Sequence, residues 1–246
     1  MLRSIIGVRL HLRWRKRGGW LGSHLRERIP QAPRKREIEA VARTTNDLGA
    51  QKLDDAYGEV GGVRHPNDVR SSADLGDLYA WLVQQRRPAT VVEFGSAFGV
   101  SGMYFASGLV AARRGHLYSF EINREWADIA ERNIRSIGDC VTLTRGTFED
   151  HVAAVVPDAI DLAFVDGIHT YEFVMAQFDA LRPRMSPGGV IAFDDIDFKR
   201  PGSRMRDAWE TIAADSRVTS AVEVNGRVGL AELRTQTRAQ FVTLTE

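Results

Sequence analysis

The stretch "VVEFGSAFGVSG" (91–102) decides the fold, because it joins a strand-like run to a turn that opens a helix. The apolar residues at 90–94 predict a short buried strand. Gly95 allows a tight turn, and Gly99 allows backbone to approach a ligand ahead of a helix N-terminus, which favours anions. The carboxylate of Glu93, however, would repel a pyrophosphate. The stretch therefore favours a cationic ligand over an ordinary dinucleotide.

Strands and helices alternate along the rest of the chain. Further strands are predicted at 116–122, 140–146, 160–167 and 190–195. Helices are predicted at 72–87, 99–115, 124–138, 147–156, 170–185 and 204–216. Asn225-Gly226 joins two alternating runs within 219–233, which is the strongest short hairpin signal. The order predicts an α/β fold, with a doubly wound, Rossmann-like, mostly parallel seven-stranded sheet and an antiparallel C-terminal hairpin strand.

The composition is that of a globular protein, with 43% hydrophobic and 26% charged residues. The single cysteine, Cys140, has no partner for an internal disulfide, which favours a reducing, cytoplasmic setting. No apolar run reaches the about 18 residues that a membrane-spanning helix needs. We expect a basic N-terminal arm and linker at 1–68 and one catalytic domain at 69–246.

The arm has its own charge character. Residues 1–36 carry 11 Lys and Arg but one acid, whereas the remainder is acidic. Such a run is typical of a solvated tail, or of an arm packed on the acidic body of its own or a partner subunit in a homo-oligomer. A second interpretation is peripheral contact with an anionic inner membrane face through Leu2, Ile5, Ile6, Trp14 and Trp20. In a eukaryote the same arm would suit a mitochondrial transit peptide. Nucleic acid is not an expected partner, because the body is acidic and lacks a reading motif.

Ligands of such sheets bind at the carboxyl ends of the strands, so the residues found there are candidates. Glu121 ends the second strand, 22 residues after Gly99, where a carboxylate can accept both hydroxyl hydrogens of a ribose. A surface glutamate ahead of a helix is the alternative. Thr147 and Phe148 follow the third strand and could flank an adenine ring. They could equally be a helix cap and a buried core residue.

The fourth and fifth strands end in carboxylates. Asp166 ends one strand with His169 three residues later, and Asp194 and Asp195 end the next. Three carboxylates at one rim are costly unless a cation compensates them, and oxygen ligands suit Mg²⁺ or another oxygen-preferring divalent ion. The alternative is that one or two aspartates cap helices. His169 is either a general base or a turn histidine bonded to backbone.

Over roughly residues 70–233 these motifs resemble class I S-adenosylmethionine-dependent methyltransferases, with Glu93-x-Gly95-x-x-x-Gly99 as the first motif and Glu121 as the ribose acid. Within that class, "DG-x-H-x-Y" and "DD" resemble the metal-dependent O-methyltransferases that act on macrolide sugars and, more distantly, on catechol. The resemblance implies S-adenosylmethionine as cofactor. It implies a cofactor site made of Glu93, Gly95, Ser96, Gly99, Ser101, Glu121, Thr147, Phe148 and Asp166.

The same resemblance assigns the chemistry. It implies Asp166, Asp194 and Asp195 as ligands of Mg²⁺, His169 as general base, and Ser101 as a contact of the cofactor carboxylate. The expected function is methyl transfer to a hydroxyl of a small-molecule or glycan acceptor. A hydroxylase-like or metal-independent enzyme on the same fold, and a non-catalytic S-adenosylmethionine-binding protein, are the alternatives. The glycine spacing disfavours a nicotinamide dehydrogenase.

Overall fold

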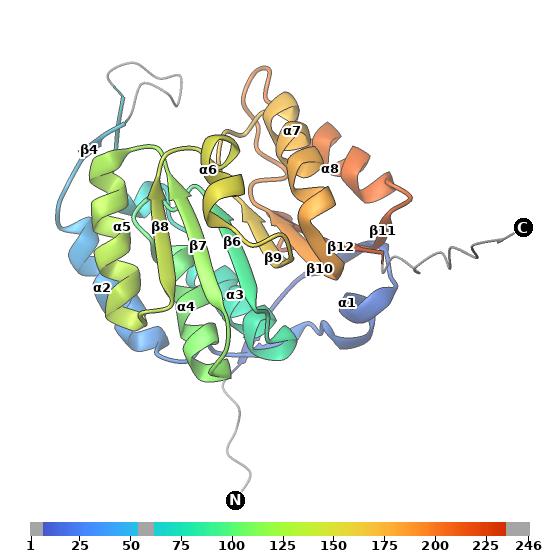
Figure 1. The fold of residues 1–246 in the computed structure, drawn as a ribbon, viewed down its shortest axis with the longest axis horizontal. Coiled ribbons are helices and arrows are strands. Elements are labelled where there is room, and N and C mark those ends of the chain that lie inside the picture. The colour runs from blue at the N-terminus through green and yellow to red at the C-terminus, as the bar shows by residue number, and fades with distance from the viewer. Residues whose placement is uncertain (1–6, 54–61, 235–246) are drawn as a thin grey trace, which may run out of the picture.

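The computed structural model describes residues 7–53 and 62–234, and its centre is one large mixed sheet (Figure 1). The strand order is β2-β11-β12-β10-β9-β6-β7-β8. Five neighbouring strands are parallel: β10 (Met185–Phe193), β9 (Ile160–Val165), β6 (Thr90–Phe94), β7 (His116–Glu121) and β8 (Val141–Arg145). The others are antiparallel: β12 (Val228–Leu233), β11 (Val218–Val224) and β2 (Leu12–Lys16). The predicted Rossmann-like α/β fold is confirmed.

The sheet has one strand more than the seven predicted. The additional strand, β2, comes from the basic arm and pairs with β11, so the C-terminal hairpin is not the edge of the sheet. Its partly buried Leu12 and Trp14 alternate with the exposed Arg13, a period of two that suits an edge strand. The sequence did not predict this strand, because the arginines between these residues are typical of a basic arm.

Six helices flank the parallel strands: α3 (Ala73–Arg86), α4 (Val100–Ala112), α5 (Arg124–Ile137), α6 (Phe148–Val155), α7 (Tyr171–Leu181) and α8 (Met205–Ala214). Ser72 caps α3 by accepting the amide of Leu75 at 3.4 Å. Two predicted boundaries were wrong. Helix α4 ends before Gly115, because Arg113 already turns left-handed with φ of 51°. The glycine pair 188–189 lies in an irregular part of β10 rather than before it.

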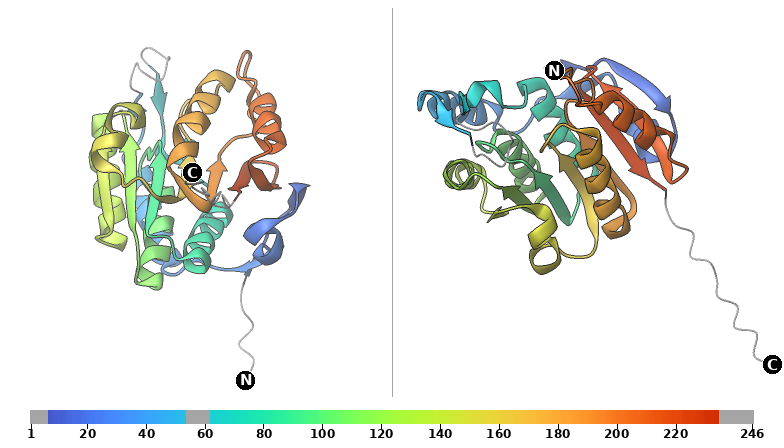
Figure 2. Two further views of the ribbon diagram at one scale, coloured as in Figure 1. Left: turned by 45° about the vertical axis from the view of Figure 1, so that its right-hand side comes forward. Right: turned by 90° about the horizontal axis from the view of Figure 1, so that it is seen from above.

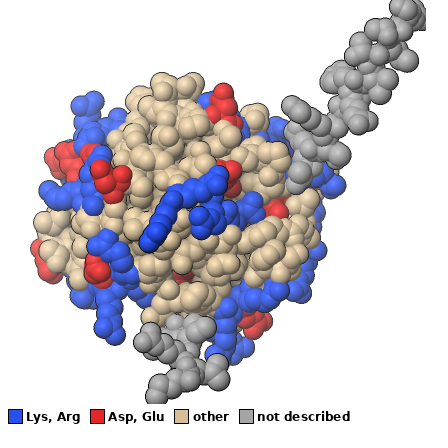
Figure 3. Space-filling view, turned by 60° about the horizontal axis from the view of Figure 1, so that its bottom comes forward, with Lys and Arg blue, Asp and Glu red and all other residues tan. Residues whose placement is uncertain are grey.

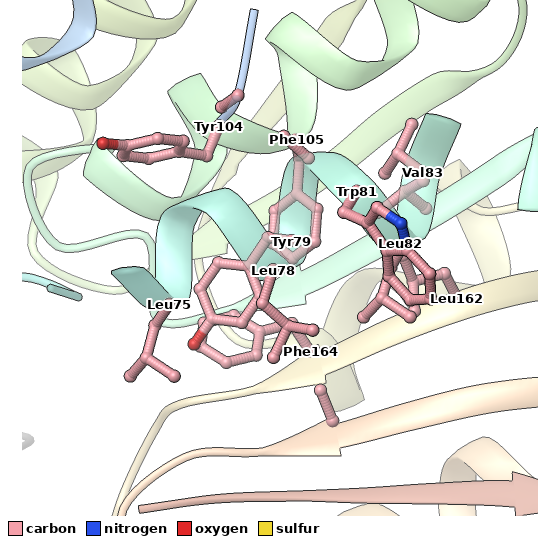
Figure 4. Packing of buried hydrophobic residues seen from close by; sticks show 14 of the residues in the cluster. Leu75, Leu78, Tyr79, Trp81, Leu82, Val83, Tyr104, Phe105, Leu162 and Phe164 are labelled. Carbon is pink, nitrogen blue, oxygen red and sulfur yellow. The ribbon is translucent and has the colours of Figure 1, made fainter. Parts of the chain in front are cut away.

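Each strand of the central sheet sends alternate side chains to opposite faces. Val91 packs with α2 (Lys35–Asn46), α3, α4 and α5, whereas Val92 packs with α6, α7 and α8. Figures 1 and 2 show these two helical layers on either side of the sheet. In the first layer Tyr79 stacks on Phe105 and contacts Phe164 of β9 (Figure 4). Burial of both faces explains the continuous apolar runs of the parallel strands.

The predicted arm and linker pack on the domain. They form β1 (Gly7–Arg9), α1 (Gly19–His24), β3 (Arg28–Pro30), α2, β4 (Gln51–Lys52), β5 (Val63–Arg64) and a short 3-10 turn at Pro66–Asp68. Leu10, Leu21 and Ile38 are fully buried in the same core as the first helical layer. This arrangement matches the interpretation of an arm packed on its own body.

The membrane interpretation of the arm stays a prediction. Trp14 and Trp20 are partly buried against the core, and Leu2, Ile5 and Ile6 lie outside the described residues. On the face at the bottom of Figure 1, basic side chains are more widespread than acidic ones (Figure 3). Within residues 7–53 and 62–234, no helix has both the length and the apolar character needed to cross a bilayer.

If the arm belongs to the core, Leu21→Ala should lower the free energy of unfolding by about 2–5 kcal/mol, the usual range for a fully buried leucine. Leu48→Ala is the matched control. Its side chain is half exposed, so a change within about 0.5 kcal/mol is expected. Urea denaturation measures both. Equal, small effects would show that the arm does not pack as described.

Candidate active site

A cavity of about 510 Å³ opens at the carboxyl ends of the central strands. Its wall combines the turn after β6, the segment after β9 and the loop after β10 with residues from the N-terminal part of the chain. It lies within the usual range for small-molecule sites. The lining residues that matter below are Gly95, Trp126, Asp166, His169, Asp195, Phe198 and Arg227.

The turn after β6 lies against the end of β9. Gly95 has φ of +80°, and a Cβ added there would overlap the carbonyl oxygen of Asp166, so only glycine fits. The amides of Gly95 and Ser96 both donate to the carbonyl of Phe120, at 3.0 and 3.2 Å. Gly99 has a structural role, and its expected approach to a ligand stays a prediction. It caps α4 at φ of +81°, and an added Cβ would come 2.9 Å from Cα of Ala130 in α5.

Glu93 lies beneath this turn and outside the main cavity. It is fully buried, and its carboxylate accepts the hydroxyls of Ser101 and Ser119, each at 2.5 Å. Burial raises the pKa of Glu93 to about 7, although the two hydroxyl donors lower it. Ser96 also bonds to Ser119, and both Ser96 and Ser101 line a narrow cavity behind the turn. Glu93 therefore braces the turn.

Glu121, at the end of β7, is 1% exposed and connects the turn to the next helix. One carboxylate oxygen accepts the amide of Ala97 at 2.8 Å, and the other accepts the amide of Asn123 at 2.9 Å. Glu121 is not among the residues that line the main cavity, so the ribose contact stays a prediction from the resemblance.

Thr147 and Phe148 have the structural roles that were the alternative to adenine binding. Thr147 caps α6 by accepting the amide of Asp150 at 3.2 Å. Phe148 is 2% exposed and packs edge-on against Phe94 and Phe120. Neither residue lines the main cavity. Two other aromatic residues line the main cavity: Phe198, and Trp126 in the first turn of α5, which is 2% exposed and packs against Phe98.

Asp166, His169 and Asp195 meet in the cavity wall. His169 Nε2 lies 3.3 Å from Asp166 Oδ1 and 3.9 Å from Asp195 Oδ2. Burial, followed by the charge of Asp194, raises the pKa of Asp166 to about 7, although His169 lowers it. Burial opposes the charged imidazolium, but the hydrogen bond to Asp166 and the nearby carboxylates outweigh it, and the pKa of His169 is raised. The predicted base therefore sits in an acidic pocket.

Asp194 is paired with an arginine from the C-terminal hairpin. Arg227 donates from Nε to Oδ1 at 3.0 Å and from Nη2 to Oδ2 at 2.7 Å, and its Nε lies 2.9 Å from Asp195 Oδ1. Burial opposes the charge of Arg227, but its bonds to Asp194 and the other carboxylates outweigh it, so the pKa of Arg227 is raised. Asp194 itself is 0% exposed and points at this guanidinium.

The predicted metal ligands do not fit a divalent ion as they are arranged. Both oxygens of Asp194 already accept hydrogen bonds from Arg227, and Asp195 faces the same guanidinium. A magnesium site needs several oxygen ligands pointing at one centre. No group of three or more His, Cys, Asp or Glu side chains within the described ranges could hold a metal. The arrangement of the described residues therefore does not support the magnesium binding that the resemblance implied.

Trp126, Phe198 and Arg227 are among the cavity residues that the sequence did not predict. Trp126 follows Glu121 by five residues, so the strand-end rule could have found it. Phe198, in the loop after β10, lies with its ring centroid 5.2 Å from that of His169. Arg227 gave no signal, because its partners lie more than 30 residues away in the sequence.

The chain is similar in sequence to a known domain family and to several known proteins. The family described as "Methyltransferase domain" matches residues 92–196. A protein of Sinorhizobium fredii is 27% identical over 56% of this chain, but the match spans 16% of that protein's length. A protein of Mycobacterium sp. (strain JLS), provisionally named an O-methyltransferase, is 29% identical over 59% of this chain and 70% of its own length.

Solved structures show the same fold. An O-methyltransferase from Bacillus cereus in complex with SAH has a TM-score of 0.61 and 21% identity, over 87% of this chain and 96% of that one. The O-methyltransferase TomG from Streptomyces achromogenes, in complex with SAM, has a TM-score of 0.56 and 20% identity, over 81% and 98% of the two chains. The match to a methyltransferase domain at 92–196 and the fold of these solved structures agree with the predicted resemblance to class I S-adenosylmethionine-dependent methyltransferases.

Proposed function

We propose that the protein transfers the methyl group of S-adenosylmethionine to a hydroxyl of a small-molecule or glycan acceptor, with His169 as general base. The observation that carries the proposal is the placement of His169 against Asp166, inside the cavity that adjoins the Gly95 turn. O-methyltransferases among the relatives and fold neighbours support this choice of acceptor atom.

The cavity suits the cofactor on one side. Gly95 brings bare backbone to the wall, Trp126 offers an aromatic surface for the adenine, and Asp166 places negative charge there. Glu121 would hold the ribose, while Ser96 and Ser101 in the narrow cavity would face the methionine end. When bound, S-adenosylmethionine supplies an electrophilic methyl group on a positively charged sulfur. The carboxylate of Asp166 in the wall matches that charge.

The cavity lining also suits a polar acceptor. Its wall contains the charged side chains of Arg64, Asp68 and Arg200 together with the ring of Phe198. This mixture fits a molecule that carries hydroxyl groups on an apolar frame. A hydroxyl seated beside His169 would lie next to the residue that removes its proton. The polar lining supports a sugar-like acceptor over a purely flat apolar one.

The Asp166 carboxylate determines which ring nitrogen of His169 carries the proton. Because it lies next to Nε2, it holds the proton of neutral His169 on that atom and leaves the lone pair on Nδ1. Nδ1 can then accept the acceptor's proton as oxygen attacks the methyl carbon. Asp166 and Asp195 stabilise the imidazolium that results. Holding acceptor and base in one cavity supplies much of the acceleration.

The cofactor role of Glu121 is tested by Glu121→Ala. We expect S-adenosylmethionine to bind about 1–3 kcal/mol more weakly, because a charge-assisted hydrogen bond is lost. Isothermal titration calorimetry measures the change. Glu125→Ala, an exposed glutamate on the first turn of α5, should bind as the native protein does. An affinity for Glu121→Ala equal to that of the control would remove Glu121 from the site.

The base role is tested by His169→Ala. We expect kcat to fall by about 10²–10⁴, the range for a general base, with cofactor affinity unchanged. His24→Ala, an exposed histidine stacked on Trp20, is the control and should keep native kcat. Radiolabelled methyl transfer to candidate polyhydroxyl acceptors provides the assay. Full kcat in His169→Ala would assign the proton to another group.

The same assay gives a pH profile. Because only neutral His169 accepts a proton, the rate should rise with pH through the histidine pKa. The neighbouring carboxylates raise that pKa, so the rise should lie above the ordinary histidine value of about 6.5. The limb should vanish in His169→Ala. A native profile that is flat between pH 6 and about 8 would contradict the assignment.

A further inference from the structure

Arg227 sits in a turn whose backbone is fixed from two sides. Asn225 and Gly226 both have positive φ, as a tight hairpin turn requires, and the amide of Arg227 donates to Val224 at 3.0 Å. The carbonyl of Arg227 accepts the amide of Ile196 at 2.9 Å, which ties the turn to the loop after β10. The hairpin is therefore built to present Arg227 to the end of that strand.

The contact between Arg227 and Asp194 has the geometry of a strong pair. Two nitrogens of one planar guanidinium meet both oxygens of one carboxylate, at 3.0 and 2.7 Å. Asp194 is fully buried, whereas Arg227 keeps 38% of its side chain exposed and lines the cavity. The pair thus places a permanent positive charge at the point where the carboxylates converge.

We propose that Arg227 is the resident cation of this site and that methyl transfer here is independent of a divalent metal. The inference rests on the proposed function and deepens it. Arg227 neutralises Asp194 and faces Asp195, which are two of the three carboxylates that a metal would need. A metal could bind them only after Arg227 had left, and Asp194 has no contact with solvent to compensate the loss.

A guanidinium in place of a metal ion changes which group acts in each step of the reaction. An arginine stays protonated at all working pH values, and it has no open coordination position at which the acceptor oxygen could bind, as a metal ion would have. Deprotonation of the acceptor then depends on His169 and its carboxylate partners. Arg227 acts through Asp194 and Asp195 and is therefore a positioning residue, which keeps Asp195 beside the imidazole.

The decisive experiment measures Mn²⁺ binding by electron paramagnetic resonance, together with the melting temperature, on the full chain. The native protein should bind no Mn²⁺ at the site, and Mn²⁺ should leave its melting temperature unchanged. Arg227→Met releases the carboxylates. This variant should melt at a lower temperature, bind one Mn²⁺ with a dissociation constant below about 1 mM, and recover stability as Mn²⁺ is added.

Two further variants serve as controls. Arg206→Met removes an arginine that pairs with Glu223 of the same hairpin at 3.1 Å, and it should gain no Mn²⁺ site. Arg227→Lys keeps a positive charge and should exclude Mn²⁺ even if Arg227→Met fails to fold. Tight Mn²⁺ binding by the native protein would overturn the proposal, as would a folded Arg227→Met variant that binds no more Mn²⁺ than the native protein does.

Activity provides a separate readout. Methyl transfer by the native enzyme should be unchanged after treatment with a strong chelator, and its loss would contradict metal independence. If no methyl transfer occurs to any acceptor, the proposed function fails. The Mn²⁺ measurement still decides the role of Arg227 in that case, because it needs no acceptor.

Discussion

The architecture of the site depends on one buried carboxylate. Asp194 ends the central strand β10 with no solvent exposure, and an unpaired charge in that position would be strongly destabilising. Arg227 supplies the partner and thereby fixes the β11–β12 turn against the end of β10. Asn225 of the same turn exchanges hydrogen bonds with the backbone of His11, next to β2. The ion pair thus lies at the meeting point of the central sheet, the hairpin and the N-terminal segment.

The close approach at Gly95 organises the other half of the cavity. The turn at Gly95 lies on the backbone of Asp166. Asp166 therefore belongs both to the wall that would hold the cofactor and to the wall that holds His169. Glu93 and Glu121 hold that turn from below and from the side. Methyl donor and proton acceptor are placed next to each other by strand order, since β6, β9 and β10 are neighbours.

Sequence patterns predicted what depends on local information. Strand runs and the Asn225-Gly226 turn need only neighbouring residues, and the convergence of Asp166 and Asp195 follows from parallel pairing. Contacts between residues that are far apart in the sequence could not be predicted from local patterns. Trp14 pairs with Val222, about 200 residues later, and Arg227 meets Asp194 across 33 residues. At Thr147 and Phe148 the same residues were compatible with a ligand site and with a helix cap followed by a core residue. The structure has the cap and the core residue.

The central claim is that a guanidinium, and not a divalent ion, balances the carboxylates at the end of β10. The most direct measurement is a crystal structure of the protein with S-adenosylhomocysteine and excess Mn²⁺, with anomalous diffraction recorded at the manganese edge. The account predicts no anomalous peak among Asp166, Asp194 and Asp195, with the Arg227 guanidinium on both oxygens of Asp194. A manganese peak bonded to those carboxylates, with Arg227 turned away, would contradict it.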